Sequence, residues 1–80
     1  MKLKILAFGI VKDIVKGPSF EIETPVFVDA NSLKIILEEK YPVLKKLSSF
    51  MIAVNDEYAD TSQKILEGDE IAIIPPVSGG

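Results

Sequence analysis

The chain has 80 residues, carries a formal net charge of −3 and contains neither cysteine nor histidine. A chain of this length makes one domain with one core, which buries about 60 to 65% of the surface of the unfolded chain. The acidic balance argues against a nucleic-acid partner, because neutralising phosphates requires clustered Lys and Arg side chains. Without Cys and His the chain lacks disulfides, the usual zinc ligands and the commonest catalytic bases and nucleophiles. We therefore expect no bound metal and no autonomous hydrolase or redox activity.

Targeting and membrane signals are missing from the sequence. The N-terminus lacks the pattern of a secretory signal peptide, and no apolar run approaches the roughly 20 residues of a membrane-spanning helix. We therefore expect a cytoplasmic protein without a membrane partner.

A first strand is predicted at residues 2–8, where Leu3, Ile5 and Ala7 recur with a period of two. This period places the three residues on the core side of a sheet. Leu6 and Phe8 fall on the opposite side, where a solvated sheet is ordinarily polar. Both are therefore candidates for a partner interface.

Residues 9–18 are predicted to form a loop, because they begin at Gly9 and end in the turn signal Gly17-Pro18. A second strand is predicted at residues 19–24 and is expected to pair with the first. Asp29 is the predicted N-cap of the main helix, which spans residues 30–40 and stops before Pro42. A buried strand at residues 50–54, a turn at 55–57 and a turn at 67–69 follow.

The last predicted strand spans residues 70–74, with Ile71 and Ile73 toward the core. Ala72 and Ile74 then face the other way. If this strand lies beside the first one, its outward residues join those of the first strand in one apolar surface. The element order predicts an α+β fold in which a mixed sheet of four to five strands is crossed by one main helix, within a domain of residues 1–74.

Residues 75–80 are predicted to form an extended, flexible tail. Two prolines fix φ and remove backbone donors, so the segment is expected to leave the sheet without folding back. Six residues span at most roughly 20 Å, enough to enter a partner's active site. Terminal glycines have no Cβ, so a narrow channel can admit the backbone and leave the final carboxylate open to attack. The alternative is an ordinary frayed terminus. The predicted tail-insertion residues are Pro75, Pro76, Val77, Ser78 and Gly79, and the predicted reactive residue is Gly80.

Several motifs carry a resemblance to a known family. They are the segments KILAFG at 4–9, VKD at 11–13, VN at 54–55, LEGDEIA at 66–72 and above all PPVSGG at 75–80. With these motifs the chain resembles the small subunits of molybdopterin synthase, within the ubiquitin-like β-grasp superfamily. Members often have an aromatic residue where Ala7 stands, an Arg where Lys12 stands and an aromatic residue where Ile74 stands. These departures concern the partner interface and leave the tail unchanged.

The resemblance implies a sulfur carrier without catalytic groups of its own. An activating enzyme similar to those of ubiquitin systems would adenylate the Gly80 carboxylate with ATP and Mg²⁺, and a sulfur donor would convert it to a thiocarboxylate. No cofactor is expected to stay bound. The large subunit of the synthase, in a heterotetramer with this chain, would use the thiocarboxylate to sulfurate a cyclic pyranopterin phosphate. Two deliveries would build the dithiolene that binds molybdenum or tungsten.

The implied partner interface has six residues: Leu6, Phe8, Lys12, Tyr58, Ala72 and Ile74. Lys12 could pair with an acidic group or a phosphate, although lysine is usually just solvated. Three other functions remain open: a protein modifier conjugated through Gly80, as in small archaeal relatives, an inert interaction module, and the sulfur carrier of thiamine biosynthesis. The double proline argues against the last of these.

Overall fold

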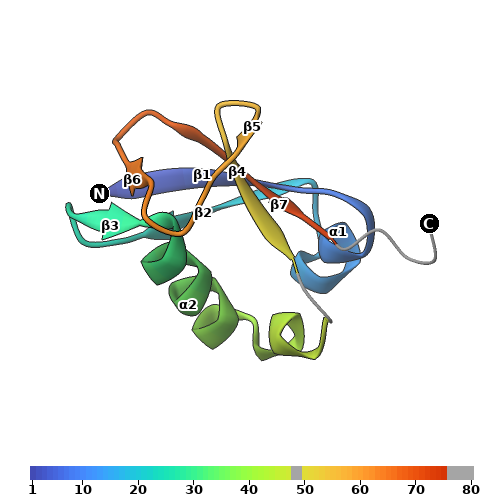
Figure 1. The fold of residues 1–80 in the computed structure, drawn as a ribbon. Helices are drawn as coiled ribbons and strands as arrows, with labels where there is room; N and C mark the ends of the chain where they lie inside the picture. The colour runs from blue at the N-terminus through green and yellow to red at the C-terminus, as the bar shows by residue number, and fades with distance from the viewer. Residues whose placement is uncertain (48–49, 76–80) are drawn as a thin grey trace.

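The computed structural model describes residues 1–47 and 50–75 (Figure 1). Seven strands, two α-helices and one 3₁₀ helix occur in this part of the chain. In chain order they are β1 (Lys2–Ala7), α1 (Gly9–Val15), β2 (Ser19–Glu23), β3 (Val28–Asp29), α2 (Ala30–Lys40), η1 (Pro42–Lys46), β4 (Met51–Val54), β5 (Glu57–Tyr58), β6 (Lys64–Ile65) and β7 (Glu70–Ile74).

Five strands form a mixed sheet in the order β2-β1-β7-β4-β5. The central pair, β1 and β7, is parallel, and the other pairs are antiparallel. The main helix α2 packs across one face of this sheet (Figure 1). This arrangement confirms the predicted α+β fold, the pairing of the first two strands and the adjacency of the first and last strands. The short pair β3 and β6 forms a second sheet that the sequence pattern did not predict.

The core lies between the sheet and α2. On β1 the three odd-numbered residues are at most 3% exposed, and Ile71 and Ile73 on β7 are fully buried. Leu33 and Leu37 of α2 are buried against them in the same cluster. The predicted core side of both central strands is therefore confirmed.

The main helix has the predicted bounds and the predicted cap. Asp29 Oδ1 accepts a hydrogen bond of 2.8 Å from the backbone N–H of Ser32, which satisfies one of the free donors at the helix start. This bond, followed by one from the Ser32 side chain, lowers the pKa of Asp29. At the other end Pro42 begins the 3₁₀ helix η1, whose Leu44 is buried.

The predicted loop at residues 9–18 is wrong, because Gly9–Val15 forms the helix α1. The helix is stabilised by Val11, which is fully buried, and by partly buried Ile14 and Val15 three and four residues further on. Gly9 starts the helix with a φ of 55°, and Lys16 ends it in the left-handed region. The turn residues Gly9 and Gly17-Pro18 therefore flank a short helix, whereas the sequence reasoning assigned the whole segment to a loop.

Candidate functional site

The face of the sheet that α2 does not cover contains a shallow hollow. We call this face the outer face. Its hollow is lined by the side chains of Leu6, Phe8, Ala53, Asp56, Tyr58, Glu70, Ala72 and Ile74. The lining comes from β1 and the residue that follows it, from β4, β5 and β7, and from the turn between β4 and β5.

Strand register explains why these side chains meet. Leu6 lies beside Ala72 in the parallel pair of β1 and β7, and Ala53 lies opposite Tyr58 in the antiparallel pair of β4 and β5. Residues in register point to the same side of a sheet. Phe8 is 48% exposed and Tyr58 is 65% exposed, so both rings remain accessible on this face.

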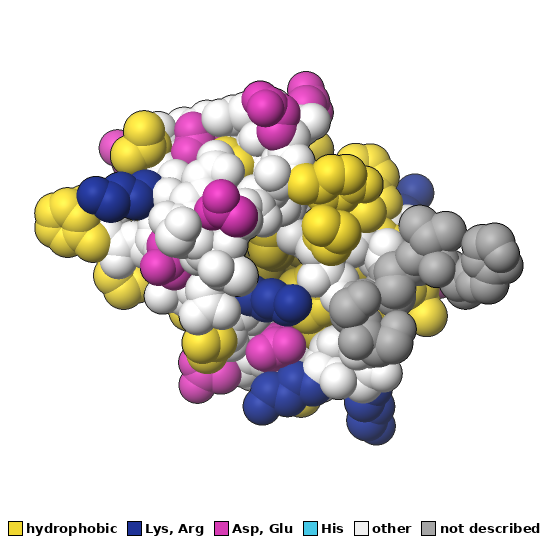
Figure 2. Space-filling view, viewed as in Figure 1, with side chains coloured by type: hydrophobic (Ala, Val, Ile, Leu, Met, Phe, Trp, Pro, Cys, Tyr) yellow, Lys and Arg dark blue, Asp and Glu magenta, His cyan; other side chains and the backbone are white. Residues whose placement is uncertain are grey.

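Five of the six predicted interface residues thus line one hollow, namely Leu6, Phe8, Tyr58, Ala72 and Ile74. The sixth, Lys12, lies exposed on α1 and does not line it. Figure 2 shows one group of hydrophobic side chains right of the centre of the visible surface, further hydrophobic side chains on its left side, and acidic side chains along the top of the view. Hollows with an apolar centre are typical of contact sites, so this arrangement is a candidate binding surface.

The tail begins at the rim of this hollow. Strand β7 ends at Ile74, the predicted last residue of this strand, and Pro75 follows it. A Cβ placed on Gly9 would come within 3.1 Å of Pro75 Cγ, so the first tail residue lies against the start of α1. The remaining predicted tail residues, Pro76 to Gly79, and the predicted reactive residue Gly80 lie outside the described residues, as does the prediction of a flexible tail.

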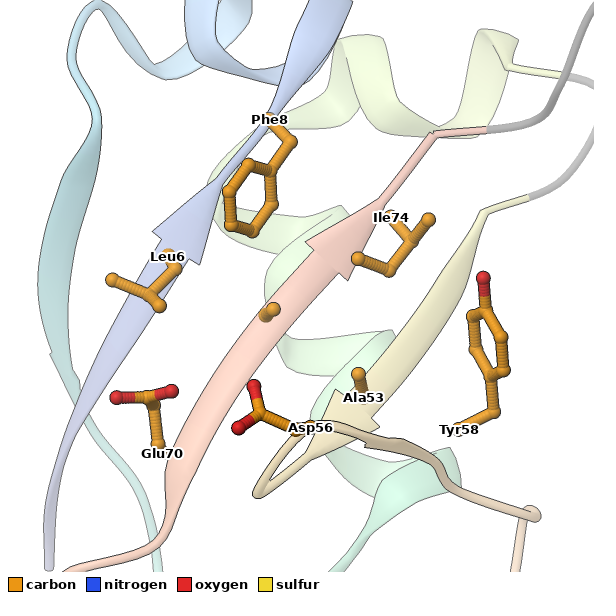
Figure 3. A pocket seen from close by; sticks show the side chains of 8 residues that line it. Leu6, Phe8, Ala53, Asp56, Tyr58, Glu70 and Ile74 are labelled. Carbon is orange, nitrogen blue, oxygen red and sulfur yellow. The ribbon is translucent and has the colours of Figure 1, made fainter.

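The far end of the hollow is acidic. Figure 3 shows the Asp56 and Glu70 carboxylates at the end opposite Phe8 and Ile74. Sequence reasoning missed both residues. Glu70 could have been found, because it precedes Ala72 by two positions on the same strand face. The place of Asp56 depends on the turn conformation, which alternation does not specify.

A second hollow lies at β3 and β6. Its exposed apolar residues are Val26, Phe27 and Leu66, of which Phe27 is 93% exposed. The sequence reasoning assigned no role to them. The helices of residues 1–47 and 50–75 include none with the length and hydropathy needed to span a bilayer.

Comparison with known protein sequences places this chain in a family. The sequence model of the ThiS family matches residues 5–80. The molybdopterin synthase sulfur carrier subunit of Dictyostelium discoideum is 42% identical to this chain, over 99% of this chain and 96% of that protein. The subunit of the same name from Caenorhabditis briggsae is 40% identical, over 100% of this chain and 99% of that protein.

Solved structures agree with this placement. A chain in the complex of subunits 1 and 2 of the molybdopterin-converting factor from Helicobacter pylori is 32% identical, with a TM-score of 0.67 and full coverage of both chains. A putative molybdopterin converting factor subunit 1 from Pyrococcus furiosus has a TM-score of 0.86 at 22% identity, covering 96% of this chain and 99% of that chain.

SAMP1 from Haloferax volcanii, a small archaeal modifier protein, has a TM-score of 0.83 at 19% identity, with full coverage of both chains. The likenesses below 25% identity concern the fold alone, and they confirm the ubiquitin-like β-grasp architecture. The chain therefore belongs to the ThiS family, within the group of molybdopterin synthase sulfur carrier subunits.

Proposed function

We propose that this protein carries sulfur as a thiocarboxylate on Gly80 and delivers it within molybdopterin synthase. The observation that carries the proposal is the position of Pro75, which leaves β7 at the rim of the apolar outer face. A partner bound on this face would stand beside the origin of the tail. The identity of 40 to 42% with proteins named as sulfur carrier subunits supports the same function.

Activation takes two steps at the Gly80 carboxylate, and only the second changes the bonds of its carbonyl carbon. A carboxylate is a poor electrophile because it is anionic, so an adenylating enzyme first joins it to the α-phosphate of ATP and releases pyrophosphate with the help of Mg²⁺. Hydrosulfide then attacks the acyl adenylate, the bond to AMP breaks, and a proton is lost to leave the thiocarboxylate. Both reactants come from outside this chain. The chain's own contribution is a steric one, since paired glycines at 79 and 80 present no Cβ to the enzyme's channel.

Delivery takes place in the large subunit. The thiocarboxylate sulfur attacks a carbon of a cyclic pyranopterin monophosphate, and the carbon–oxygen bond at that carbon breaks. Water then hydrolyses the resulting thioester, which returns the Gly80 carboxylate and leaves the sulfur on the pterin. Two deliveries supply the two sulfurs of a dithiolene. The catalytic acids and bases belong to the large subunit in this proposal, because this chain has neither His nor Cys. The solved Helicobacter pylori complex of subunits 1 and 2 supports pairing with a large subunit, and a heterotetramer is the assembly we propose.

Intact-mass measurement tests the proposal. The protein is incubated with an adenylating enzyme of this family, ATP, Mg²⁺ and sulfide, and we expect one oxygen to be replaced by one sulfur. Deleting Gly80 abolishes the exchange without lowering the thermal midpoint of unfolding, whereas the control Ser78→Ala loads normally. Loading that survives the deletion would place the reactive carbon elsewhere. Isopeptide adducts on lysine in cells, without sulfur loading, would support a protein modifier instead.

A further inference from the structure

The outer face has different chemistry at its two ends. Phe8 and Ile74 lie at the end where the tail begins, and Glu70 and Asp56 lie at the other end, with Leu6 between them (Figure 3). Ala72, the register partner of Leu6, stands between Glu70 and Ile74 on β7. Both carboxylate residues are exposed. A partner that covers the whole hollow must therefore bury apolar surface at one end and meet negative charge at the other.

Lysines on the same face do not balance this charge. Lys2 and Lys4 of β1 share the outer face with Leu6. Their register partners on β2 are Glu23 and Glu21, and Lys4 is also in register with Glu70 of β7. Directly opposite residues of unlike charge form favourable cross-strand pairs. Lys4 thus lies between the carboxylates of Glu21 and Glu70. With Glu23 and Asp56 included, the two lysines stand against four carboxylates, so this face keeps two negative charges in excess.

Hydrogen bonds of Asn55, the residue before Asp56, fix the turn against the start of β7. Asn55 Oδ1 accepts a bond of 2.9 Å from the backbone N–H of Glu70, and Asn55 Nδ2 donates one of 3.0 Å to Asp69 Oδ1. Asn55 and Asp56 both have positive φ, of 52° and 70°. Positive φ at both central positions is characteristic of the tight hairpin turns that match the twist of the strands. The backbone that presents both carboxylates is therefore fixed before a partner binds, which lowers the entropy cost of binding.

We propose that the Glu70 and Asp56 end of the outer face receives an arginine side chain of the large subunit. The inference rests on the proposed function, which makes that subunit the occupant of this face. A guanidinium has five donors in a planar fork and is weakly hydrated, so it can bond two carboxylates beside an apolar floor. The stem of the arginine packs over Leu6 and Ala72, and the tail at the other end enters the partner's active site. The acidic end thus sets the direction in which the carrier docks.

The test neutralises the two carboxylates without disturbing the turn. Asp56→Asn is tolerated at positive φ, and Glu70→Gln leaves its backbone hydrogen bond intact. The control variant combines Glu57→Gln with Glu67→Gln, which removes the same net charge. Glu57 is exposed and lies in register with buried Val54, on the side of β5 away from the outer face, and Glu67 lines the second hollow.

Association with the purified large subunit is measured by surface plasmon resonance at low and at high salt. We expect the Asp56→Asn/Glu70→Gln protein to associate about 5- to 10-fold more slowly at low salt and to lose most of its salt dependence. The control pair should stay within about twofold of the wild type. Sulfur loading by the adenylating enzyme, followed by intact mass, confirms that each variant is folded and has an accessible tail.

Each outcome bears on a separate claim. If the wild type binds the large subunit and the double variant binds equally fast, the proposed arginine site at Glu70 and Asp56 is overturned and the sulfur-carrier function stands. If the control pair slows association as much as the double variant does, general charge attraction explains the slower association and the proposed arginine site is overturned. If the wild type neither loads sulfur nor binds the large subunit, the proposed function fails and the proposed arginine site fails with it.

Discussion

The two faces of the central strands differ in what their side chains do, although both carry apolar residues. On β7, Ile71 and Ile73 are fully buried under α2, whereas Ala72 and Ile74 line the outer hollow. A sheet with one solvated face ordinarily alternates apolar and polar residues. The departure from that pattern is confined to the end of the outer face beside the tail. Folding therefore depends on the inner face, and the outer face is free to be specialised for a partner.

The adjacent pair Ile73 and Ile74 gives the largest expected contrast between the faces. Ile73 is fully buried between Ile52 and Ala7 in neighbouring strands, so Ile73→Ala leaves a cavity in the core. We expect a loss of about 2 to 5 kcal/mol in the free energy of unfolding. Ile74→Ala should cost less than about 1 kcal/mol, because its side chain is only partly buried. Urea unfolding curves of the two variants provide the measurement.

Equal losses of stability from Ile73→Ala and Ile74→Ala would contradict the division of labour between the faces. The complementary measurement is the affinity for the large subunit under conditions where both variants are folded. There Ile74→Ala should bind more weakly than Ile73→Ala. The opposite order would mean that the partner recognises a feature other than the outer face.

Phe8 tests the outer face alone. Its ring is 48% exposed at the tail end of the hollow, and a partner that covers it would bury a large aromatic side chain. Phe8→Ala should weaken large-subunit binding about 30-fold, corresponding to about 2 kcal/mol, with little change in stability. The matched control is Phe27→Ala, which removes a 93% exposed ring from the second hollow. Calorimetric titration of both variants gives the affinities, and a comparable loss from Phe27→Ala would place the binding site at the second hollow.

Much of the fold could be predicted from the sequence because periodicity and caps report local physics directly. Asp29 and Pro42 bounded α2, and alternation on β1 and β7 assigned both faces correctly. The helix α1 was missed because Gly9 and Gly17-Pro18 dominate so short a segment, although Val11, Ile14 and Val15 stand at helical spacing within it.

The part of the candidate site that depends on alternation along the strands could be predicted from the sequence. Leu6, Phe8, Ala72 and Ile74 followed from strand faces and from the assumed pairing of β1 with β7, which the structure contains. Asp56 could not be placed, because its position depends on two consecutive residues with positive φ. The roles of Lys12 and Gly80 remain predictions, since one lies away from the hollow and the other outside the described residues.

Gly9 stands between a residue of the outer face and a residue of the core. Phe8 before it lines the outer hollow, and Val11 two positions after it is buried. An alanine there would have a φ of 55° and a Cβ 3.1 Å from Pro75 Cγ. We expect Gly9→Ala to lower stability by about 1 kcal/mol and to displace the start of the tail. Gly68→Ala is the control, since its φ of 91° is also unfavourable but its Cβ meets nothing within 4 Å. Both variants should lose stability in thermal unfolding, and only Gly9→Ala should also transfer sulfur more slowly. Equal transfer rates would show that the contact with Pro75 does not position the tail.

Asp29 gives the smallest expected effect. We expect that effect to concern the start of α2 and not the outer face. Its folded-state pKa lies below the usual 3.8, so its contribution to stability is complete above that pH and is lost as the pH falls through the folded-state pKa. Asp29→Ala should lower the thermal midpoint at pH 7, and the difference from wild type should shrink toward pH 3. Asp29→Ser keeps a neutral cap, so its midpoint at pH 7 should stay above that of the alanine variant. A deficit in Asp29→Ala that does not change with pH would assign the effect to helix propensity and not to the charged cap. Partner affinity should be unchanged in both variants, because Asp29 lines the second hollow and not the outer face.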